Sequence, residues 1–223
     1  MRYKYSKIYH VPWSKSITND DEVLSDDDLK LYKNKKVALT LKMDGECTTK
    51  YNDHYHARSI DSKDHISRHH VKQLHSRIKY DIPDNWRICG ENLEAKHSLK
   101  YNNIDSYFMV FSIFNENNIH LSLKETLEWC DLLNLWHVPI LDIIDFDENK
   151  IKEYCNNLNT DINEGICIRN IDSFHFSDFK NNYCKYVRKN HVQTDEHWMY
   201  KPIERNTLNT TSIKPNYMVK YKL

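Results

Sequence analysis

Glycine is scarce in this chain, and its few positions constrain how the chain can fold. Only three of the 223 residues are glycine, far below the usual share of roughly 7%. They are Gly45, Gly90 and Gly165, and a glutamate adjoins each of them. Glycine is favoured where the backbone turns with a positive φ or closely approaches another group. We therefore expect these three points to meet in one site that handles phosphate and metal, assembled from strands that are distant in sequence.

Length and composition indicate a folded chain with a buried core. Hydrophobic residues make up 39% and charged residues 29% of the sequence, which excludes the disordered and membrane-embedded classes of protein. No run of about 18 apolar residues occurs, so no transmembrane helix and no membrane partner are expected. The N-terminus lacks the apolar core of a signal peptide. We expect a cytoplasmic protein, in the host cytoplasm if the source is viral, whose six cysteines are reduced and mostly buried.

Charge is balanced overall but segregated along the chain. The sequence has 32 basic and 32 acidic residues. Acidic residues are dense at 20–28, whereas basic residues are dense at 68–79, at 185–189 and in the final twenty residues. Arg68 is expected on the solvent-facing side of a helix together with other cations. Because nucleic-acid binding requires a local basic face and not a basic total, neutrality does not exclude it.

Hydrophobic periodicity predicts one mixed α+β domain. Residues 36–59 alternate as a β-hairpin or meander, in which Val37 and Leu39 face one side and Lys42 faces the other. The other expected elements are helices near 25–32, 65–79, 122–135 and 147–158, and strands near 86–89, 107–114, 138–144, 165–169 and 183–187. These elements predict a mainly antiparallel sheet flanked by helices over residues 1–200, followed by a basic C-terminal tail at 201–223.

Lys42 is a candidate nucleophile because it ends a strand and stands two residues before Asp44-Gly45. A lysine attacks only when it is neutral, so its pKa near 10.4 must fall. Lys185 and the two cations at 188–189 are candidates for the crowding that would lower it. Taken alone, the pattern is equally typical of a solvated hairpin tip.

Six short motifs that occur in order along the chain strengthen the interpretation of Lys42 as a nucleophile. They are Lys42-Met43-Asp44-Gly45, His56-Ala57-Arg58-Ser59, Cys89-Gly90-Glu91-Asn92, Tyr107 to Ile113, Glu164 to Arg169, and Lys185 to Lys189. The series resembles motifs I, Ia, III, IIIa, IV and V of the covalent nucleotidyltransferases, a superfamily of RNA ligases, DNA ligases and capping enzymes. The surrounding sequence is most similar to the RNA ligase 2-like ATP-dependent RNA ligases. The resemblance spans roughly residues 36–198.

The resemblance implies an adenylyltransferase domain of the ATP-grasp-like ligase type and a catalytic set within it. Lys42 would attack the α-phosphate of ATP and become lysyl-AMP, and Lys185 would hold that phosphate. Glu164 would orient the lysine or bind the metal, Mg²⁺ or Mn²⁺, with Asp44 as a second metal ligand. The activity implied is joining of RNA 5′-phosphate and 3′-OH ends in a duplex, as in RNA repair.

The resemblance also implies a set of nucleotide-binding residues. Arg58 would hold a phosphate, Glu91 would hydrogen-bond the ribose and Phe111 would stack on adenine. Leu41 occupies the position where this group often has a glutamate that contacts the base, so adenine recognition should differ here. Each of these residues also has an ordinary structural interpretation, as a surface arginine, a turn carboxylate or a core aromatic ring.

Three other functions remain open from the sequence. Only 34 residues follow Lys189, too few for the OB-fold domain that DNA ligases and capping enzymes usually carry. We therefore expect a minimal catalytic module, for which a protein partner is a candidate source of the missing C-terminal domain. The alternatives are a stand-alone 5′-end adenylyltransferase, a DNA ligase, and a nucleic-acid-binding module that has lost catalysis.

Overall fold

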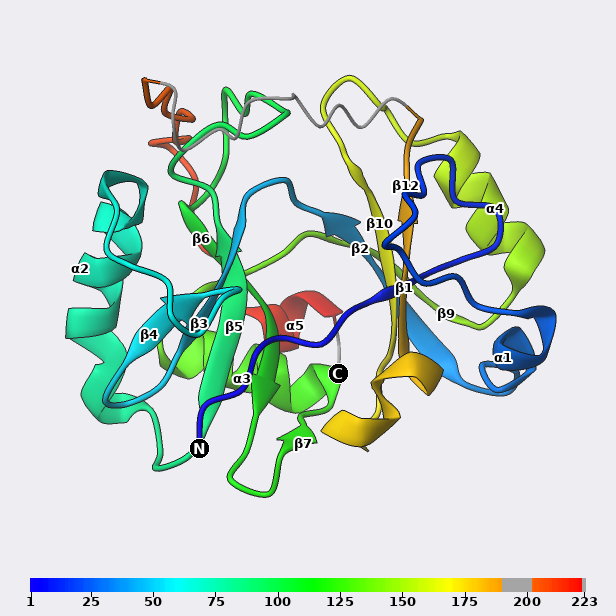
Figure 1. Ribbon diagram of the computed structural model, residues 1–223, viewed down its shortest axis with the longest axis horizontal. Helices are drawn as coiled ribbons and strands as arrows, with labels where there is room; N and C mark the ends of the chain where they lie inside the picture. The colour runs from blue at the N-terminus through cyan, green and yellow to red at the C-terminus, as the bar shows by residue number, and fades with distance from the viewer. Residues whose placement is uncertain (190–201, 222–223) are drawn as a thin grey trace.

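Two β-sheets form the centre of the computed structural model, which describes residues 1–189 and 202–221. They stand on opposite sides of the molecule, with helices around them (Figure 1). The five-stranded sheet has the order β1 (Tyr9–His10), β12 (Tyr183–Val187), β10 (Gly165–Asn170), β2 (Lys36–Lys42), β9 (Ile140–Asp145). The seven-stranded sheet has the order β11 (Phe174–His175), β7 (Ile119–His120), β6 (Phe108–Phe114), β5 (Arg87–Asn92), β3 (Glu46–Lys50), β4 (Tyr55–Ala57), and β8 (Trp136–His137) also pairs with β6.

Among the described strands, only β1 with β12 and β6 with β8 pair in parallel. The prediction of an α+β domain with mainly antiparallel sheets flanked by helices is therefore confirmed. The helices are α1 (Asp26–Lys30), α2 (His69–Ile78), α3 (Leu123–Leu132), α4 (Glu148–Asn156) and α5 (Tyr217–Tyr221), with 3₁₀ turns at Ile66–Arg68, Lys79–Asp81 and Phe176–Asn181. None of the helices in the described part of the chain has the length and apolarity needed to cross a membrane.

Helix starts follow local capping chemistry. The Ser122 side chain accepts a hydrogen bond from the Glu125 backbone N–H, and the Glu125 carboxylate accepts one from the Ser122 backbone N–H. Ser25 and Asp28 form the same reciprocal pair at α1. These two capping boxes satisfy backbone donors that a helix leaves open at its start.

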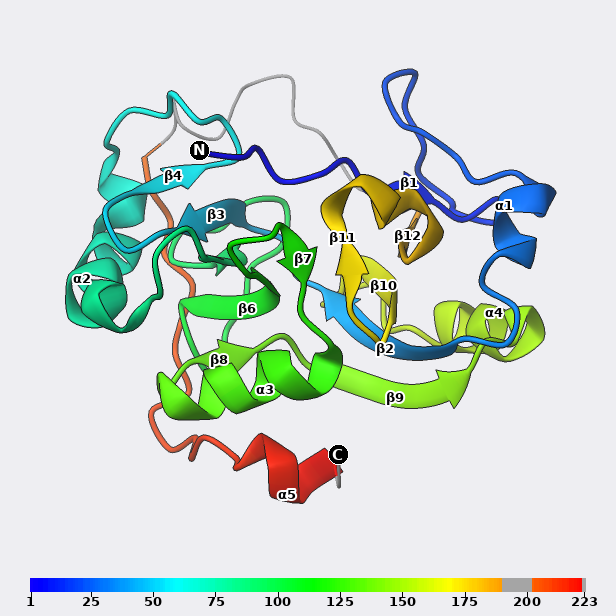
Figure 2. The same ribbon diagram turned by 90° about the horizontal axis from the view of Figure 1, so that it is seen from below.

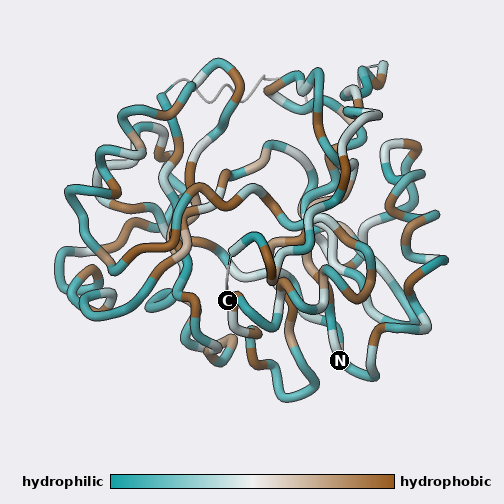
Figure 3. The backbone as a smooth tube through the Cα atoms, turned by 180° about the vertical axis from the view of Figure 1, so that it is seen from behind, coloured by the Kyte–Doolittle hydropathy of each residue, from teal (hydrophilic) through white to brown (hydrophobic). Residues whose placement is uncertain are grey.

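Helices α1 and α4 cover one face of the five-stranded sheet. Val37 and Leu39 of β2 pack with Leu29 of α1 and with Ile151 of α4. Leu41, near the end of β2, packs instead against a different cluster of buried residues. Figure 3 shows hydrophobic stretches in the central strands and hydrophilic ones in the peripheral loops. On the opposite face of β2, Ala38 belongs to the main hydrophobic core, whereas Thr40 and Lys42 line the cavity described below.

The chain passes between the two sheets directly after Lys42. The prediction of a hairpin or meander over 36–59 holds for β3 with β4 but is wrong for β2 and β3, which belong to different sheets. At the crossing, a Cβ atom on Gly45 would overlap the Asn92 carbonyl oxygen. Glycine is therefore used here for close approach, and none of the described glycines has a positive φ.

A second crossing occurs at Pro139. The strand predicted over 138–144, broken near this proline, proves to be β9 from Ile140 onward, and β8, which ends just before the predicted range, belongs to the other sheet. The Pro139 carbonyl accepts a hydrogen bond from the Leu41 backbone N–H, so the two crossings are joined. The two crossings therefore hold strand ends from both sheets close together, beside the region between the sheets.

Residues 202–221 lie against the body of the domain. The buried Asn206 side chain donates to the carbonyls of Leu93 and Ala95 and accepts from the Tyr101 backbone N–H. Tyr217 of α5 belongs to the same hydrophobic cluster as α3, and Figure 2 shows α5 beside that helix. The division of the chain into a domain over 1–200 and a tail over 201–223 stays a prediction. These contacts indicate that removing the segment would destabilise the fold.

Lys50 allows a prediction about the pH dependence of stability. Its ammonium donates to the Val71 carbonyl at 2.6 Å and lies 4.8 Å from the centre of the Phe108 ring. Burial lowers the pKa of Lys50 from 10.5 to about 7. The unfolded chain therefore binds more protons than the folded chain between pH 7 and 10.5, so stability rises with pH across that window and the full cost is present below it.

We expect Lys50→Met to raise the free energy of unfolding at pH 6 by about 1–3 kcal/mol, since it removes a buried charge that has no carboxylate partner among the described residues. Urea denaturation at pH 6 and at pH 9 measures this, and the gain should shrink at the higher pH. A variant that is less stable than the parent at pH 6 would contradict the prediction.

Candidate active site

A cavity of about 1050 Å³ opens between the two sheets. All eight residues that the sequence predicted for the site line it. They are Leu41, Lys42, Asp44, Arg58, Glu91, Phe111, Glu164 and Lys185. Segments that lie more than a hundred residues apart are therefore brought to one place, as the glycine positions predicted.

Strand register in the five-stranded sheet explains how Lys42, Glu164 and Lys185 come to line the same cavity. Lys42 of β2 pairs with Gly165 of β10, which pairs in turn with Val187 of β12. Glu164 directly precedes Gly165, and Lys185 stands two residues before Val187 on the same face of its strand. A Cβ atom on Gly165 would overlap the Tyr186 carbonyl oxygen, so glycine is needed where these strands meet.

Lys42 is paired with Glu164 in this structure. Its ammonium donates to Glu164 Oε2 at 2.5 Å, and the side chains are 24% and 4% exposed respectively. Burial disfavours the charge on Lys42, but the Glu164 carboxylate and then Glu91 more than offset this and raise its pKa above the usual value. The expectation that neighbouring cations make Lys42 neutral is thus wrong. The lysine must lose a proton before it can attack.

Lys185 is the second cation of the site and is also paired. Its ammonium lies 3.4 Å from Asp21 Oδ1, and both side chains are largely buried, with 17% and 22% exposure. Burial and the nearby Lys42 lower the pKa of Lys185, while Asp21 acts in the opposite direction. Two ammonium groups on one sheet face are therefore each balanced by a carboxylate.

Glu91 and Asp44 lie at the crossing between the sheets. Glu91 Oε1 accepts a hydrogen bond from the Gly45 backbone N–H at 3.1 Å, and burial raises the pKa of Glu91 to about 8. The Asp44 carboxylate accepts from the Leu99 backbone N–H at 2.6 Å, and the Asp44 backbone N–H donates to the Tyr101 hydroxyl. These bonds favour a role for Asp44 in fixing the loop.

Phe111 and Arg58 reach the cavity from the seven-stranded sheet side. Phe111 is half-buried, and its ring meets Tyr5 edge-on with 5.0 Å between ring centres. The Tyr5 hydroxyl is bonded to Ser112, which is bonded in turn to His120 Nε2, each at 2.8 Å. This buried polar chain fixes the ring that packs against Phe111. Arg58 follows β4 and is exposed.

Sequence analysis missed several residues of the cavity wall. Thr40 shares the face of Lys42, so strand alternation contained a signal for it. It is buried, and its hydroxyl has no hydrogen-bond partner among the described residues. Cys167 stands between Thr40 and Lys185 in the register of β10. For Tyr5 and Asp21, which come from the N-terminal segment, the sequence held no signal.

Arg68 also lines the cavity, contrary to prediction. It was expected to face solvent, but it is buried and forms two bonds with the Glu46 carboxylate, at 2.7 and 2.5 Å. Arg68 ends a 3₁₀ turn and precedes α2, so the helical period of α2 does not set its direction. Such a forked pair is more specific than a simple ion pair.

The described residues do not by themselves form a metal site. No group of three or more His, Cys, Asp or Glu side chains in residues 1–189 and 202–221 is arranged to hold an ion. Glu164 Oε2 is engaged by Lys42, and the Asp44 carboxylate by Leu99. The metal roles predicted for Glu164 and Asp44 therefore find no support in this arrangement, and they stay predictions.

Comparison with known proteins assigns the chain to a family. The profile of a family described as RNA ligase matches residues 35–187, more than half of the chain. The chain belongs to the RNA ligase family. This confirms the resemblance to RNA ligases within the covalent nucleotidyltransferases. No curated protein matches the sequence.

Solved structures share the fold of this RNA ligase family member. A Naegleria gruberi RNA ligase with PPi is 16% identical, with a TM-score of 0.53, and the match covers 84% of this chain and 61% of that one. A mutant of that ligase with ATP and Mn is 14% identical, with a TM-score of 0.52 and coverage of 83% and 61%. A protein from Aquifex aeolicus, provisionally described as an ATP-dependent DNA ligase, is 24% identical, with a TM-score of 0.50 and coverage of 72% and 46%. The chain thus spans about 61% of the length of the Naegleria ligase.

Proposed function

We propose that this chain is the nucleotidyltransferase module of an ATP-dependent RNA ligase. In the first step Lys42 Nζ forms a bond to the α-phosphorus of ATP, the bond to the β-phosphate oxygen breaks, and pyrophosphate leaves. The AMP then passes to the 5′-phosphate of an RNA end. Attack by an adjacent 3′-OH joins the two ends and releases AMP.

The observation that carries the proposal is the Lys42–Glu164 pair beside Lys185, in a chain that belongs to the RNA ligase family. Glu164 holds the Lys42 ammonium at the cavity wall and is the nearest carboxylate for its proton. Lys185 supplies a fixed positive charge for the phosphate oxygens on which negative charge accumulates. Phe111 offers an aromatic face, and Arg58 an exposed guanidinium, at the cavity.

In this proposal, a divalent ion binds to the protein as part of its complex with ATP. The Naegleria ligase mutant was solved with ATP and Mn, and ATP normally arrives as a complex in which phosphate oxygens and waters supply most of the ligands of Mg²⁺. The pairing of Lys42 and Lys185 with carboxylates reduces the net positive charge that these two groups offer to bare ATP. We therefore propose that the complex of ATP with Mg²⁺ or Mn²⁺ is the substrate.

The direct test is an intact mass measured after incubation with ATP and Mg²⁺. We expect a mass increase equal to one AMP, together with release of pyrophosphate. Peptide mapping should place the adduct on Lys42. Absence of an adduct with both Mg²⁺ and Mn²⁺ would favour the nucleic-acid-binding module that has lost catalysis.

A second experiment tests which kind of polynucleotide ends the protein joins. A nick whose 3′-OH side is RNA should be sealed faster than an all-DNA nick, and sealing should weaken steeply with salt because phosphate contacts release counterions. Equal sealing of both nicks would favour a DNA ligase. Adenylylated 5′ ends that are never sealed would favour a stand-alone adenylyltransferase, and recovery of sealing with an added extract would indicate a protein partner.

Leu41 leads to a prediction about base selectivity. The side chain lines the cavity and cannot hydrogen-bond a base. Hydrogen-bonded recognition discriminates far more strongly than stacking, so we expect measurable use of GTP. Leu41→Glu should partly restore the preference for ATP, and competition between labelled ATP and GTP measures it. If the wild-type chain rejects GTP, the unpartnered Thr40 hydroxyl is the next candidate for base recognition.

A further inference from the structure

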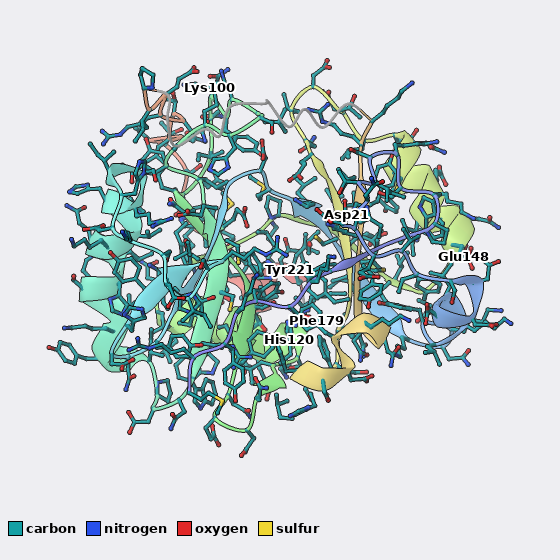
Figure 4. The ribbon with its side chains drawn as sticks, viewed as in Figure 1. Asp21, Lys100, His120, Glu148, Phe179 and Tyr221 are labelled. Atoms are coloured by element: carbon teal, nitrogen blue, oxygen red, sulfur yellow. The ribbon has the colours of Figure 1, made fainter. Side chains whose placement is uncertain are left out.

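Asp21 of the N-terminal segment is held in one orientation. Its Oδ2 atom accepts hydrogen bonds from both the backbone N–H and the hydroxyl of Thr18, at 3.0 and 2.9 Å. This leaves Oδ1 to face the cavity, where it lies 3.1 Å from His10 Nε2 and 3.4 Å from Lys185 Nζ. Figure 4 shows Asp21 beside the strands of the five-stranded sheet.

The backbone reinforces this arrangement. His10 pairs directly with Lys185 in the parallel ladder between β1 and β12. The imidazole is buried, and its Nδ1 is bonded to Ser14 at 2.8 Å. Burial and the Lys185 charge lower the pKa of His10 to about 4, so the ring is neutral at pH 7 and Asp21 is the anion that faces Lys185 from this segment.

Lys185 needs such an anion because it shares a sheet face with Lys42. The two ammonium groups repel each other, and Glu164 is committed to Lys42. The groups acting on Lys185 are Lys42 from β2, Cys167 from β10, and Asp21. Asp21 therefore balances the positive charge of Lys185, as Glu164 balances that of Lys42. An ammonium has three donors, so Lys185 can keep its contact with Asp21 while it also binds a phosphate oxygen.

We propose that Asp21 is a positioning residue for Lys185, whose ammonium it holds toward the cavity. The inference rests on the proposed function for the role of Lys185 in adenylylation, but the contact itself is independent of that function. This proposal gives the segment from His10 to Asp21, which precedes the first recognised motif, a role in positioning Lys185.

The kinetic test compares Asp21→Asn with Asp26→Asn in the full-length protein. Asp26 begins α1 a few residues further along, is exposed, does not line the cavity and forms no ion pair among the described residues. Single-turnover formation of lysyl-AMP should slow by about 10- to 100-fold in Asp21→Asn, since misplacing a group by 1 Å has effects of that order. Asp26→Asn should stay within about twofold, and Asp21→Glu should recover part of the rate.

Coupling separates positioning from a general loss of structure. In a Lys185→Ala background, adding Asp21→Asn should change the rate by less than about twofold, because the group it positions is already gone. An equal loss in both backgrounds would overturn the proposal. So would faster adenylylation by Asp21→Asn at low ATP concentration, which would mean that Asp21 competes with the phosphate.

A readout that needs no activity keeps this inference distinct from the proposed function. NMR of lysines labelled at Cε, with Lys185 assigned through Lys185→Arg, follows the titration of its ammonium. Loss of a neighbouring carboxylate should lower the pKa of Lys185 in Asp21→Asn but not in Asp26→Asn. An unchanged titration would overturn the inference even if lysyl-AMP forms. Failure to form lysyl-AMP with a shifted titration would overturn only the proposed function.

Discussion

Lys42→Ala is expected to abolish the covalent AMP adduct. The variant removes the only atom proposed to bond to the α-phosphorus, so intact mass should show no adduct after prolonged incubation with ATP and Mg²⁺. Lys42→Arg should fail as well, because a guanidinium does not lose its proton under these conditions. An adduct of unchanged stoichiometry in either variant would disprove the assignment of the nucleophile.

The control for Lys42 comes from the same strand. Lys36, at the other end of β2, is exposed, and Lys36→Ala should form the adduct at the parental rate. Lys42→Ala removes the ammonium that is paired with the buried Glu164, and loss of one partner of a buried hydrogen-bonded pair costs on the order of 1–3 kcal/mol. A thermal melt therefore accompanies the assay, so that loss of the adduct is scored on folded protein.

Lys185→Ala is expected to slow lysyl-AMP formation by 10²-fold or more, which corresponds to roughly 2.7 kcal/mol of barrier. The ammonium is proposed to act on the α-phosphate as negative charge develops there, so the loss should fall on the maximal single-turnover rate more than on the ATP concentration at half-maximal rate. Quenched-flow measurement with labelled ATP separates these two quantities.

The matched control is Lys124→Ala. Lys124 belongs to α3, is exposed and does not line the cavity, so its loss removes one positive charge without touching the Asp21 contact. It should change the rate by no more than about twofold. A rate for Lys185→Ala within fivefold of the parent would show that Lys185 does not act on the phosphate.

Sequence alone was enough to predict several local elements and the residues that prove to line the cavity. Capping at Ser122, the shared face of Val37 and Leu39 in β2 and the apolar run of β6 depend on neighbours within a few residues, and all three are found where the sequence predicted them. The motif order gave the family, because six short motifs in sequence specify far more than any one of them.

Only the tertiary structure decided how those elements meet. No local signal distinguishes a hairpin from a passage between two sheets after Lys42, because both need a short turn. The passage is set by the contact of Gly45 with the Asn92 carbonyl, 47 residues away. In the same way, alternation places Lys42 and Lys185 on their strand faces but not beside each other; the register through Gly165 does that.

Charge pairing was likewise decided by the fold. The sequence predicted that cations would crowd Lys42, whereas the folded chain gives Lys42 the Glu164 carboxylate and gives Lys185 the Asp21 carboxylate. Electrostatic partners depend on distances of a few ångströms between residues more than a hundred positions apart, and periodicity contains no information about them. The sequence thus determined which groups are available for phosphate chemistry, and the packing of the two sheets determined which of them face one another.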